Sequence, residues 1–280
     1  MKYYIVGKTS EKGPTYEDSG DLNSYYELGW ELMMTHVRVK KLKHLGVFED
    51  NDVVVTTNDD RKFLYTTEFK NVISWSEFIN LGINENIIDL VNLSITDGHK
   101  DMVNDLIQDN ELINKLCSFE VDSQTKLKIK NKFVCLQFRK RVHSSERNLD
   151  ENFFKEIINL IVEDYGLDVY VMGLGSELFC DNKKIFYVNL KQFTTLINDE
   201  NCILFYSTMS GPAHLSNFFT SKKTKHIVND ISNCRYGNDS LKNHPLYMGD
   251  IFNYSRANIE IVPSYQNMVF YKNILKNLLN

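Results

Sequence analysis

The 280-residue chain is 42% hydrophobic and 25% charged, the composition of an ordinary globular protein that is long enough to bury a sizeable core. Its formal net charge is −5, so nucleic acid is not an expected partner and any anion-binding site has to be local. The five cysteines include no pair at CxxC spacing, which excludes zinc and redox motifs of that kind.

The first half of the chain has an irregular α/β pattern. Apolar and β-branched runs predict four strands, at 2–6, 52–57, 62–67 and 71–75. A polar loop rich in Gly, Ser and Thr follows the first strand, and the mixed pattern of 21–45 suits one or two helices. Residues 86–93 fit either a strand or a helix, and 100–118 are expected to be helical.

The second half of the chain alternates strands and helices more regularly. Short apolar runs predict five strands, at 133–138, 168–172, 184–188, 202–206 and 225–229. Apolar residues at helical spacing predict helices at 151–163, at 190–197 and within 207–219. Strands that are apolar throughout are typical of a parallel sheet covered on both faces, so this half is predicted to be a doubly wound α/β domain.

The predicted domain organisation is two α/β lobes. A polar, charged connection at 119–131 is the expected hinge, which gives a first lobe at 1–125 and a second at 126–262. The tail has apolar residues along one helical face, so 263–280 are expected to form a C-terminal helix. Two lobes of this kind have a natural ligand-binding cleft at the carboxyl ends of their strands.

A basic loop follows the strand predicted at 133–138. It contains Arg139, Lys140 and Arg147 together with histidine and serine residues. Cations and hydroxyls at the carboxyl end of a strand can bind a phosphate or diphosphate, and arginine does so with two parallel hydrogen bonds. The alternative is a solvated loop that pairs with surface carboxylates.

A second loop leaves the strand predicted at 202–206. Its small, hydroxyl-bearing or turn-forming residues are Ser207, Thr208, Ser210, Gly211, Pro212, Ala213 and His214. Small residues let the backbone approach a ligand, and Ser210 and Pro212 suit the start of a helix. The free N–H groups of such a helix favour an anion. The alternative is a simple strand-to-helix turn in which His214 is a packing residue.

The remaining site residues lie in two other loops. Asp21, near a helix start, can act as a general base toward a hydroxyl, or it can simply cap the helix. Gly173 and Glu177 follow the strand predicted at 168–172, but the spacing there is not GxGxxG, so dinucleotide binding is not supported. We find no DxD motif in a suitable context, no HExxH motif and no Ser-His-Asp order, so neither a metal nor a cofactor is expected.

Two short motifs carry a resemblance to a known family. The stretches 20–22 (GDL) and 210–215 (SGPAHL) resemble motifs of GT-B glycosyltransferases, especially the ADP-heptose lipopolysaccharide heptosyltransferase type. In that family the first turn supplies an acceptor-side Asp, and the second lies beside the diphosphate of the donor. The chain departs from the family at 18–19, where a second Gly is usual, and after His214, where it lacks Gly-x-Pro. It is also similar to small glycosyltransferases of large DNA viruses.

The resemblance implies a GT-B fold, with two Rossmann-like lobes facing a cleft and a C-terminal helix that returns to the first lobe. It implies an inverting, metal-independent transfer of a sugar from a nucleotide-diphosphate sugar to a glycan hydroxyl, with Asp21 as the base. Arg139, Lys140, Arg147 and the 207–214 turn would hold the diphosphate, as fucosyltransferases of related architecture use a strand-end Arg. Gly173 and Glu177 would line the base or ribose pocket.

Two other functional classes remain open from the sequence. One is a nucleotide-sugar epimerase on the same scaffold, and the other is a non-catalytic glycan- or nucleotide-binding protein. The amino terminus is too polar for a signal peptide, and no apolar run approaches the roughly 20 residues that span a bilayer. Together with the unpaired cysteine pattern, this predicts a cytoplasmic protein.

Overall fold

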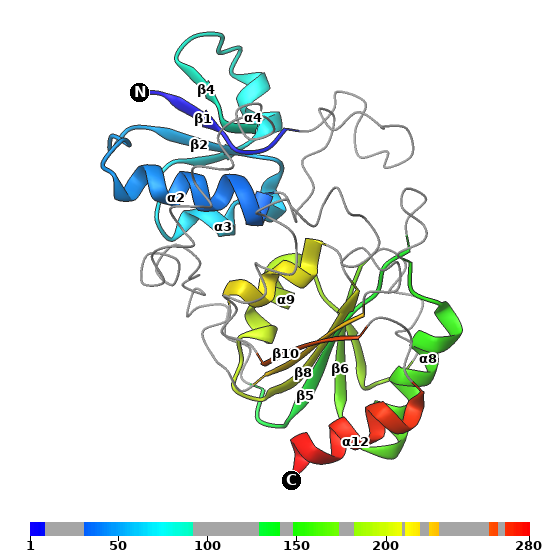
Figure 1. Ribbon diagram of the computed structural model, residues 1–280. Helices are drawn as coiled ribbons and strands as arrows, with labels where there is room; N and C mark the ends of the chain where they lie inside the picture. Colours follow the sequence, from blue (N-terminus) through cyan, green and yellow to red (C-terminus); the bar gives the residue numbers. More distant parts are fainter. Residues whose placement is uncertain are drawn as a thin grey trace, which may run out of the picture. The chain divides into compact units, whose positions relative to one another are not determined.

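The chain forms two units, each of which contains one parallel β-sheet (Figure 1). The first unit comprises Met1–Glu120 with His244–Tyr254, and the second comprises Val121–Asn243 with Ser255–Asn280. The division predicted from the sequence differs from these two units in two ways. It assigned 244–254 to the second lobe, and it separated 263–280 from that lobe. The computed structural model describes residues 1–8, 31–91, 129–140, 148–173, 182–208, 211–218, 224–229, 258–262 and 267–280.

The sheet of the first unit has four parallel strands in the order β3-β2-β1-β4. They are β1 (Tyr3–Ile5), β2 (Val53–Thr56), β3 (Val72–Ser74) and β4 (Ile87–Asp89). The run 86–93, which the sequence left open between strand and helix, contains the short strand β4, and its next residues, Leu90 and Val91, are helical. Because all four strands run the same way, their carboxyl ends lie along one edge of the sheet. One face of the sheet buries Tyr3, Ile5, Val53, Val55, Phe78 and Val91.

The helices described in the first unit are short. They are η1 (Glu31–His36), α2 (Val37–His44), η2 (Asp59–Arg61), α3 (Phe63–Thr66) and α4 (Trp75–Asn80). The strand predicted at 62–67 is wrong, because most of this run is α3. Its adjacent residues Leu64 and Tyr65 are both buried, whereas a strand would turn them to opposite faces. His36 contacts both, with Nε2 2.9 Å from the Leu64 carbonyl oxygen and its ring 5.2 Å from the Tyr65 ring.

The sheet of the second unit has six parallel strands in the order β10-β9-β8-β5-β6-β7. They are β5 (Phe133–Gln137), β6 (Asp168–Met172), β7 (Ile185–Tyr187), β8 (Cys202–Thr208), β9 (Lys225–Asn229) and β10 (Asn258–Val262). The five predicted strands are all present, and β10 is not among the predictions. The predicted α/β class with a doubly wound parallel sheet is confirmed.

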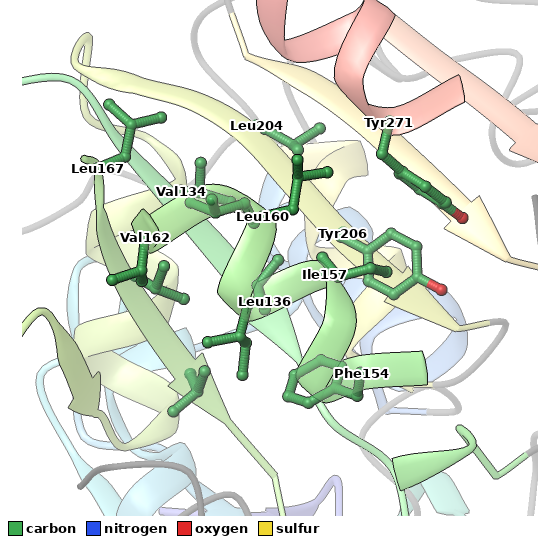
Figure 2. Close-up of a cluster of buried hydrophobic side chains, with 14 of the residues drawn as sticks. Val134, Leu136, Phe154, Ile157, Leu160, Val162, Leu167, Leu204, Tyr206 and Tyr271 are labelled. Atoms are coloured by element: carbon green, nitrogen blue, oxygen red, sulfur yellow. The ribbon is translucent and has the colours of Figure 1, made fainter. Parts of the chain in front are cut away.

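Helices cover both faces of the second sheet (Figure 1). Those described are α8 (Glu151–Asn159), η5 (Leu160–Asp164), α9 (Leu190–Ile197), η7 (Gly211–Phe218) and α12 (Met268–Leu279). On one face, α8 and α12 pack over the residues shown in Figure 2, where Leu136 and Leu204 lie in the same cluster as Phe154. On the other face, the Phe193 ring of α9 lies 5.4 Å from the ring of Phe205.

The C-terminal helix α12 is a correction to the expected architecture. The resemblance implied that this helix returns to the first lobe, but its buried face lies on the second sheet. Tyr271 and Leu275 are buried in the core beneath it, and the Tyr271 ring lies 5.9 Å from that of Tyr206 (Figure 2). Lys272 adds an ion pair with Asp164, 3.1 Å away. The apolar stripe of α12 therefore completes the core of its own unit.

Candidate functional site

The strand order of the second sheet reverses between β5 and β8. From β5 the chain moves outward to β6 and β7, and it then returns to build β8, β9 and β10 on the other side. In open α/β sheets, ligands bind outside the carboxyl ends of the strands at such a switch point. The two loops that the sequence marks as anion sites leave the sheet from these two strands, after Gln137 and after Thr208.

A buried glutamine ties the ends of these two strands together. Oε1 of Gln137 accepts hydrogen bonds from the Thr208 N–H at 3.2 Å and from the Thr208 hydroxyl at 3.3 Å. Nε2 of Gln137 donates to the carbonyl oxygen of Phe138 at 3.1 Å. Both polar side chains are almost fully buried. This contact fixes the spacing between the two loops. Gln137 is not among the site residues predicted from the sequence, where its one signal is that it is a polar residue inside the apolar run FVCLQF.

Arg139 lies two residues beyond the end of β5 and is buried to 5% exposure. Its Nη1 donates to the amide oxygen of Asn148 at 2.6 Å, and its carbonyl oxygen accepts from the N–H of Leu149 at 3.1 Å. The far end of the basic loop therefore closes onto Arg139 and holds the guanidinium at the carboxyl edge of the sheet. A side chain held in this way is not the solvated cation of the alternative interpretation.

The other two cations of the basic loop do not share this position. Lys140 is exposed, and its Nζ lies 3.4 Å from Oε2 of Glu151, at the start of α8. Glu151 also pairs with Lys155 at 2.9 Å, and hydrogen bonding from Lys155, with a smaller contribution from Lys140, lowers the pKa of this carboxyl. Lys140 thus has a carboxylate partner of its own, and Arg147 lies outside the described residues.

The strand β8 extends to Thr208, so Ser207 and Thr208, which the sequence placed in the loop, belong to the buried strand. Ser207 is fully buried, and its hydroxyl lies 2.8 Å from Nε2 of His226, whose ring stacks on Phe205 at 4.2 Å. These contacts give Ser207 a packing role, and contact with a donor stays a prediction. The predicted helix is present as η7, which has 3₁₀ rather than α geometry and starts at Gly211. Either geometry leaves the first N–H groups without partners in the helix itself.

The first turn of η7 is well packed. Gly211 and Pro212 are half-buried, and Ala213 is completely buried. Ser210 and the side chain of His214 lie outside the described residues. The buried Ala213 explains why a small residue is needed here, since a larger side chain would meet the core beneath the turn.

Gly173 is required by the backbone at the end of β6. Its φ is +126°, which L-residues rarely adopt, and a Cβ atom there would overlap the carbonyl oxygen of Phe138. The N–H of Phe138 donates to the carbonyl oxygen of Met172 at 2.8 Å, so the ends of β5 and β6 approach closely. This packing accounts for the glycine, and its contact with a donor stays a prediction. Glu177 lies outside the described residues.

A polar residue on β9 extends the row formed by Gln137 and Thr208. Asn229 lies opposite Thr208 in the sheet and is fully buried. Its Nδ2 donates to the Tyr206 hydroxyl at 3.1 Å, and within the described part of the chain its Oδ1 accepts no hydrogen bond. Most buried polar atoms in native structures have a hydrogen-bond partner. The strand was predicted, but its terminal residue was not singled out.

Other predictions concern residues that the structure does not describe. Asp21, the expected base, lies within 9–30, outside the described residues. In the described part of the chain, no group of three or more His, Cys, Asp or Glu side chains is placed to hold a metal ion. Across the same residues, no helix has the length and apolar character needed to cross a membrane.

Comparison with known proteins identifies the fold. No family model matches the chain, and no curated protein matches it. Its structure is similar to that of E. coli ADP-heptose lps heptosyltransferase II, with a TM-score of 0.53 and 9% identity, covering 100% of this chain and 98% of that one. A glycosyl transferase family 9 structure from Veillonella parvula gives a TM-score of 0.38 and 12% identity, covering 86% of this chain and 69% of that one.

The first of these similarities confirms the predicted fold. The chain has the two-sheet α/β fold of a heptosyltransferase, which is the GT-B class expected from its motifs. The similarity extends over nearly the full length of both chains, so the fold accounts for both units. The expected cleft between the lobes stays a prediction.

Proposed function

We propose that the chain is a glycosyltransferase, which moves a sugar from a nucleotide-diphosphate sugar to a hydroxyl of a glycan acceptor. The observation that carries the proposal is that the two loops marked by the sequence leave β5 and β8, the strands that flank the switch point of the second sheet. The fold similarity to a heptosyltransferase supports the same reaction class.

The donor is proposed to bind at the carboxyl edge of the second sheet. Arg139 neutralises its diphosphate, and the N–H groups at the start of η7 donate to the same oxygens. Gln137 keeps these two groups at a fixed separation through Thr208. Donors held in place before the reaction stabilise charge without reorganising as it develops. Lys140, Arg147 and Glu177 remain further contacts of the proposed donor site.

The reaction is proposed to be a single displacement that inverts the anomeric carbon. Asp21 takes the proton of the acceptor hydroxyl while the hydroxyl oxygen bonds to the anomeric carbon. The bond from that carbon to the phosphate oxygen breaks, and its electron pair leaves on the nucleotide diphosphate. Arg139 and the η7 N–H groups stabilise this leaving group, so the proposal needs no metal ion.

The release of nucleotide diphosphate from donor sugars tests this proposal. The wild type is expected to release it from one donor, and faster when a mixture of oligosaccharide acceptors is present. Asp21→Asn is expected to lose this activity while still binding the donor. The matched control is Asp50→Asn, which alters a carboxylate that is 97% exposed in the same unit. Full activity in Asp21→Asn would remove the base assignment, and no release from any donor would refute the transferase function.

A further inference from the structure

The first sheet has a switch point of its own, and an ion pair bridges it. From β1 the chain moves outward to β2 and β3 on one side, while β4 lies on the other side, so the order reverses between β1 and β4. Lys8 lies three residues past the end of β1, and Asp89 is the last residue of β4. Their side chains form an ion pair, and each is 24% exposed. The pair therefore lies where open α/β sheets bind ligands, and water reaches it.

The positions of both charged groups are set by the surrounding backbone. Gly7, just before Lys8, lies so close to Thr57 that a Cβ atom would come within 2.9 Å of the Thr57 N atom. This close approach fixes the direction in which the chain leaves β1. On the other strand, Oδ1 of Asp89 accepts from the N–H of Val91 at 3.1 Å. One carboxylate oxygen thus orients the helical residues that follow β4, while the other faces Lys8.

An aromatic ring lies beside this ion pair. The Nζ of Lys8 is 5.8 Å from the centre of the Trp75 ring, which follows β3 at the same edge of the sheet. Trp75 is only partly buried, and its inner side packs against Phe78 at 5.5 Å. A donor, an acceptor and a partly exposed aromatic surface are the groups that orient a small polar ligand in a binding site.

Two lysines at this edge are already paired with carboxylates. Lys8 pairs with Asp89, and Lys62 lies 2.7 Å from Asp59 and 2.6 Å from Glu77. An anion entering here would compete with carboxylates that are already in place, whereas sugar hydroxyls can use both members of the Lys8–Asp89 pair. The carboxylate accepts from one hydroxyl, and the ammonium donates to the oxygen of its neighbour.

We propose that Lys8, Asp89 and Trp75 form a subsite for an uncharged sugar residue of the acceptor. Neighbouring hydroxyls bridge the ion pair, and the aromatic ring contacts the C–H face of the same sugar. This inference rests on the proposed glycosyltransferase function and names its acceptor class, which is a neutral glycan rather than a phosphorylated or carboxylated one. The three residues come from three strand ends of one sheet.

Tryptophan fluorescence gives a readout that is specific to this subsite. The chain has two tryptophans, so Trp30→Phe leaves Trp75 as the single reporter. In that background we would titrate methyl glycosides of glucose, galactose and mannose, and compare them with glucuronic acid and glucose 6-phosphate. We expect at least one neutral glycoside to change the Trp75 emission in a saturable manner, and the two acidic sugars to bind more weakly.

Substitutions in the ion pair separate binding from folding. Asp89→Asn and Lys8→Met are each expected to weaken the neutral glycoside about tenfold, since hydrogen bonds to charged groups contribute on this scale. The control is Lys70→Met, whose Nζ lies 3.7 Å from Asp50 in an exposed pair of the same unit, and it should bind as the parent does. Circular dichroism and melting temperature identify any variant that fails to fold. Lys8→Arg keeps the positive charge that Lys8→Met removes, so it should restore the binding that Lys8→Met loses.

The outcomes distinguish the subsite from the function on which it rests. Stronger binding of the acidic sugars, equal binding by parent and ion-pair variants, or no response to any neutral glycoside would overturn the subsite. Nucleotide-diphosphate sugars are titrated into the same samples with melting temperature as the readout. If a donor still stabilises the protein, the subsite alone has failed. If none does, the proposed function has failed as well.

Discussion

Replacing Gln137 with leucine tests the link between the two proposed donor-binding loops. The substitution keeps a similar side-chain volume but removes the amide that accepts from Thr208 and donates to the Phe138 carbonyl oxygen. Because leucine fills the same space, no cavity forms, and the effect comes from the lost hydrogen bonds. We therefore expect a loss of stability together with a loss of donor affinity.

The magnitude follows from the groups that lose a partner. A buried donor or acceptor without its partner costs about 1–3 kcal/mol, and three hydrogen bonds are removed. The Thr208 hydroxyl can rotate and the Phe138 carbonyl oxygen has a second lone pair, so the Thr208 N–H carries most of the cost. We expect Gln137→Leu to lower the free energy of unfolding by about 2–4 kcal/mol, a large share of the 5–15 kcal/mol typical of a domain.

Urea denaturation followed by circular dichroism measures this change through the transition midpoint. The matched control is Gln192→Leu, because Gln192 is exposed and its Oε1 accepts a single hydrogen bond, from the N–H of Asn189 at 3.0 Å. Its loss should cost no more than about 1 kcal/mol, as for other helix caps. If Gln137→Leu destabilised no more than this control, the buried amide would not connect the two strand ends as we infer.

Two further predictions concern backbone and burial. Gly173→Ala should lower the urea midpoint far more than Gly46→Ala, because a Cβ at Gly173 overlaps a carbonyl oxygen while Gly46, at φ +72°, has open space around it. Equal effects would refute the close approach. Burial holds the pKa of His36 well below 6.5 in the folded state. As the pH drops below 6.5, the unfolded state therefore binds a proton that the folded state does not, and the free energy of unfolding should fall. His36→Gln should remove part of this pH dependence and the exposed control His44→Gln should not.

Local sequence patterns were sufficient for much of the second unit. The strands β6 and β9 and the helix α9 have the bounds that their apolar patterns predict. These elements are buried on one or both faces, so the residues that face the core are mainly apolar and form a recognisable pattern. The edge strand β10 was missed because its sequence, NIEIV, alternates polar and apolar residues, as expected for a strand with one face toward water.

Long-range pairing explains most of what the sequence did not reveal about the site. Gln137 and Thr208 are 71 residues apart, and Lys8 and Asp89 are 81 residues apart. In neither pair does the spacing along the sequence indicate a contact, since the contact depends on which strands are neighbours in each sheet. The strand error at 62–67 has a similar cause, because the packing of Leu64 and Tyr65 against His36 decides the local conformation.

The central claim is that the second sheet binds a nucleotide-diphosphate sugar through Arg139. A melting-temperature panel of UDP-, GDP-, ADP- and CMP-sugars tests it most directly, with the CMP-sugar serving as the monophosphate control. At a donor concentration of about 100 times Kd, binding adds about 2.7 kcal/mol to stability and raises the melting temperature. We expect one diphosphate sugar to stabilise the wild type and the Lys155→Ala control, and to stabilise Arg139→Ala much less. If no diphosphate sugar raised the melting temperature of the wild type, or if Arg139→Ala responded fully, the claim would be contradicted.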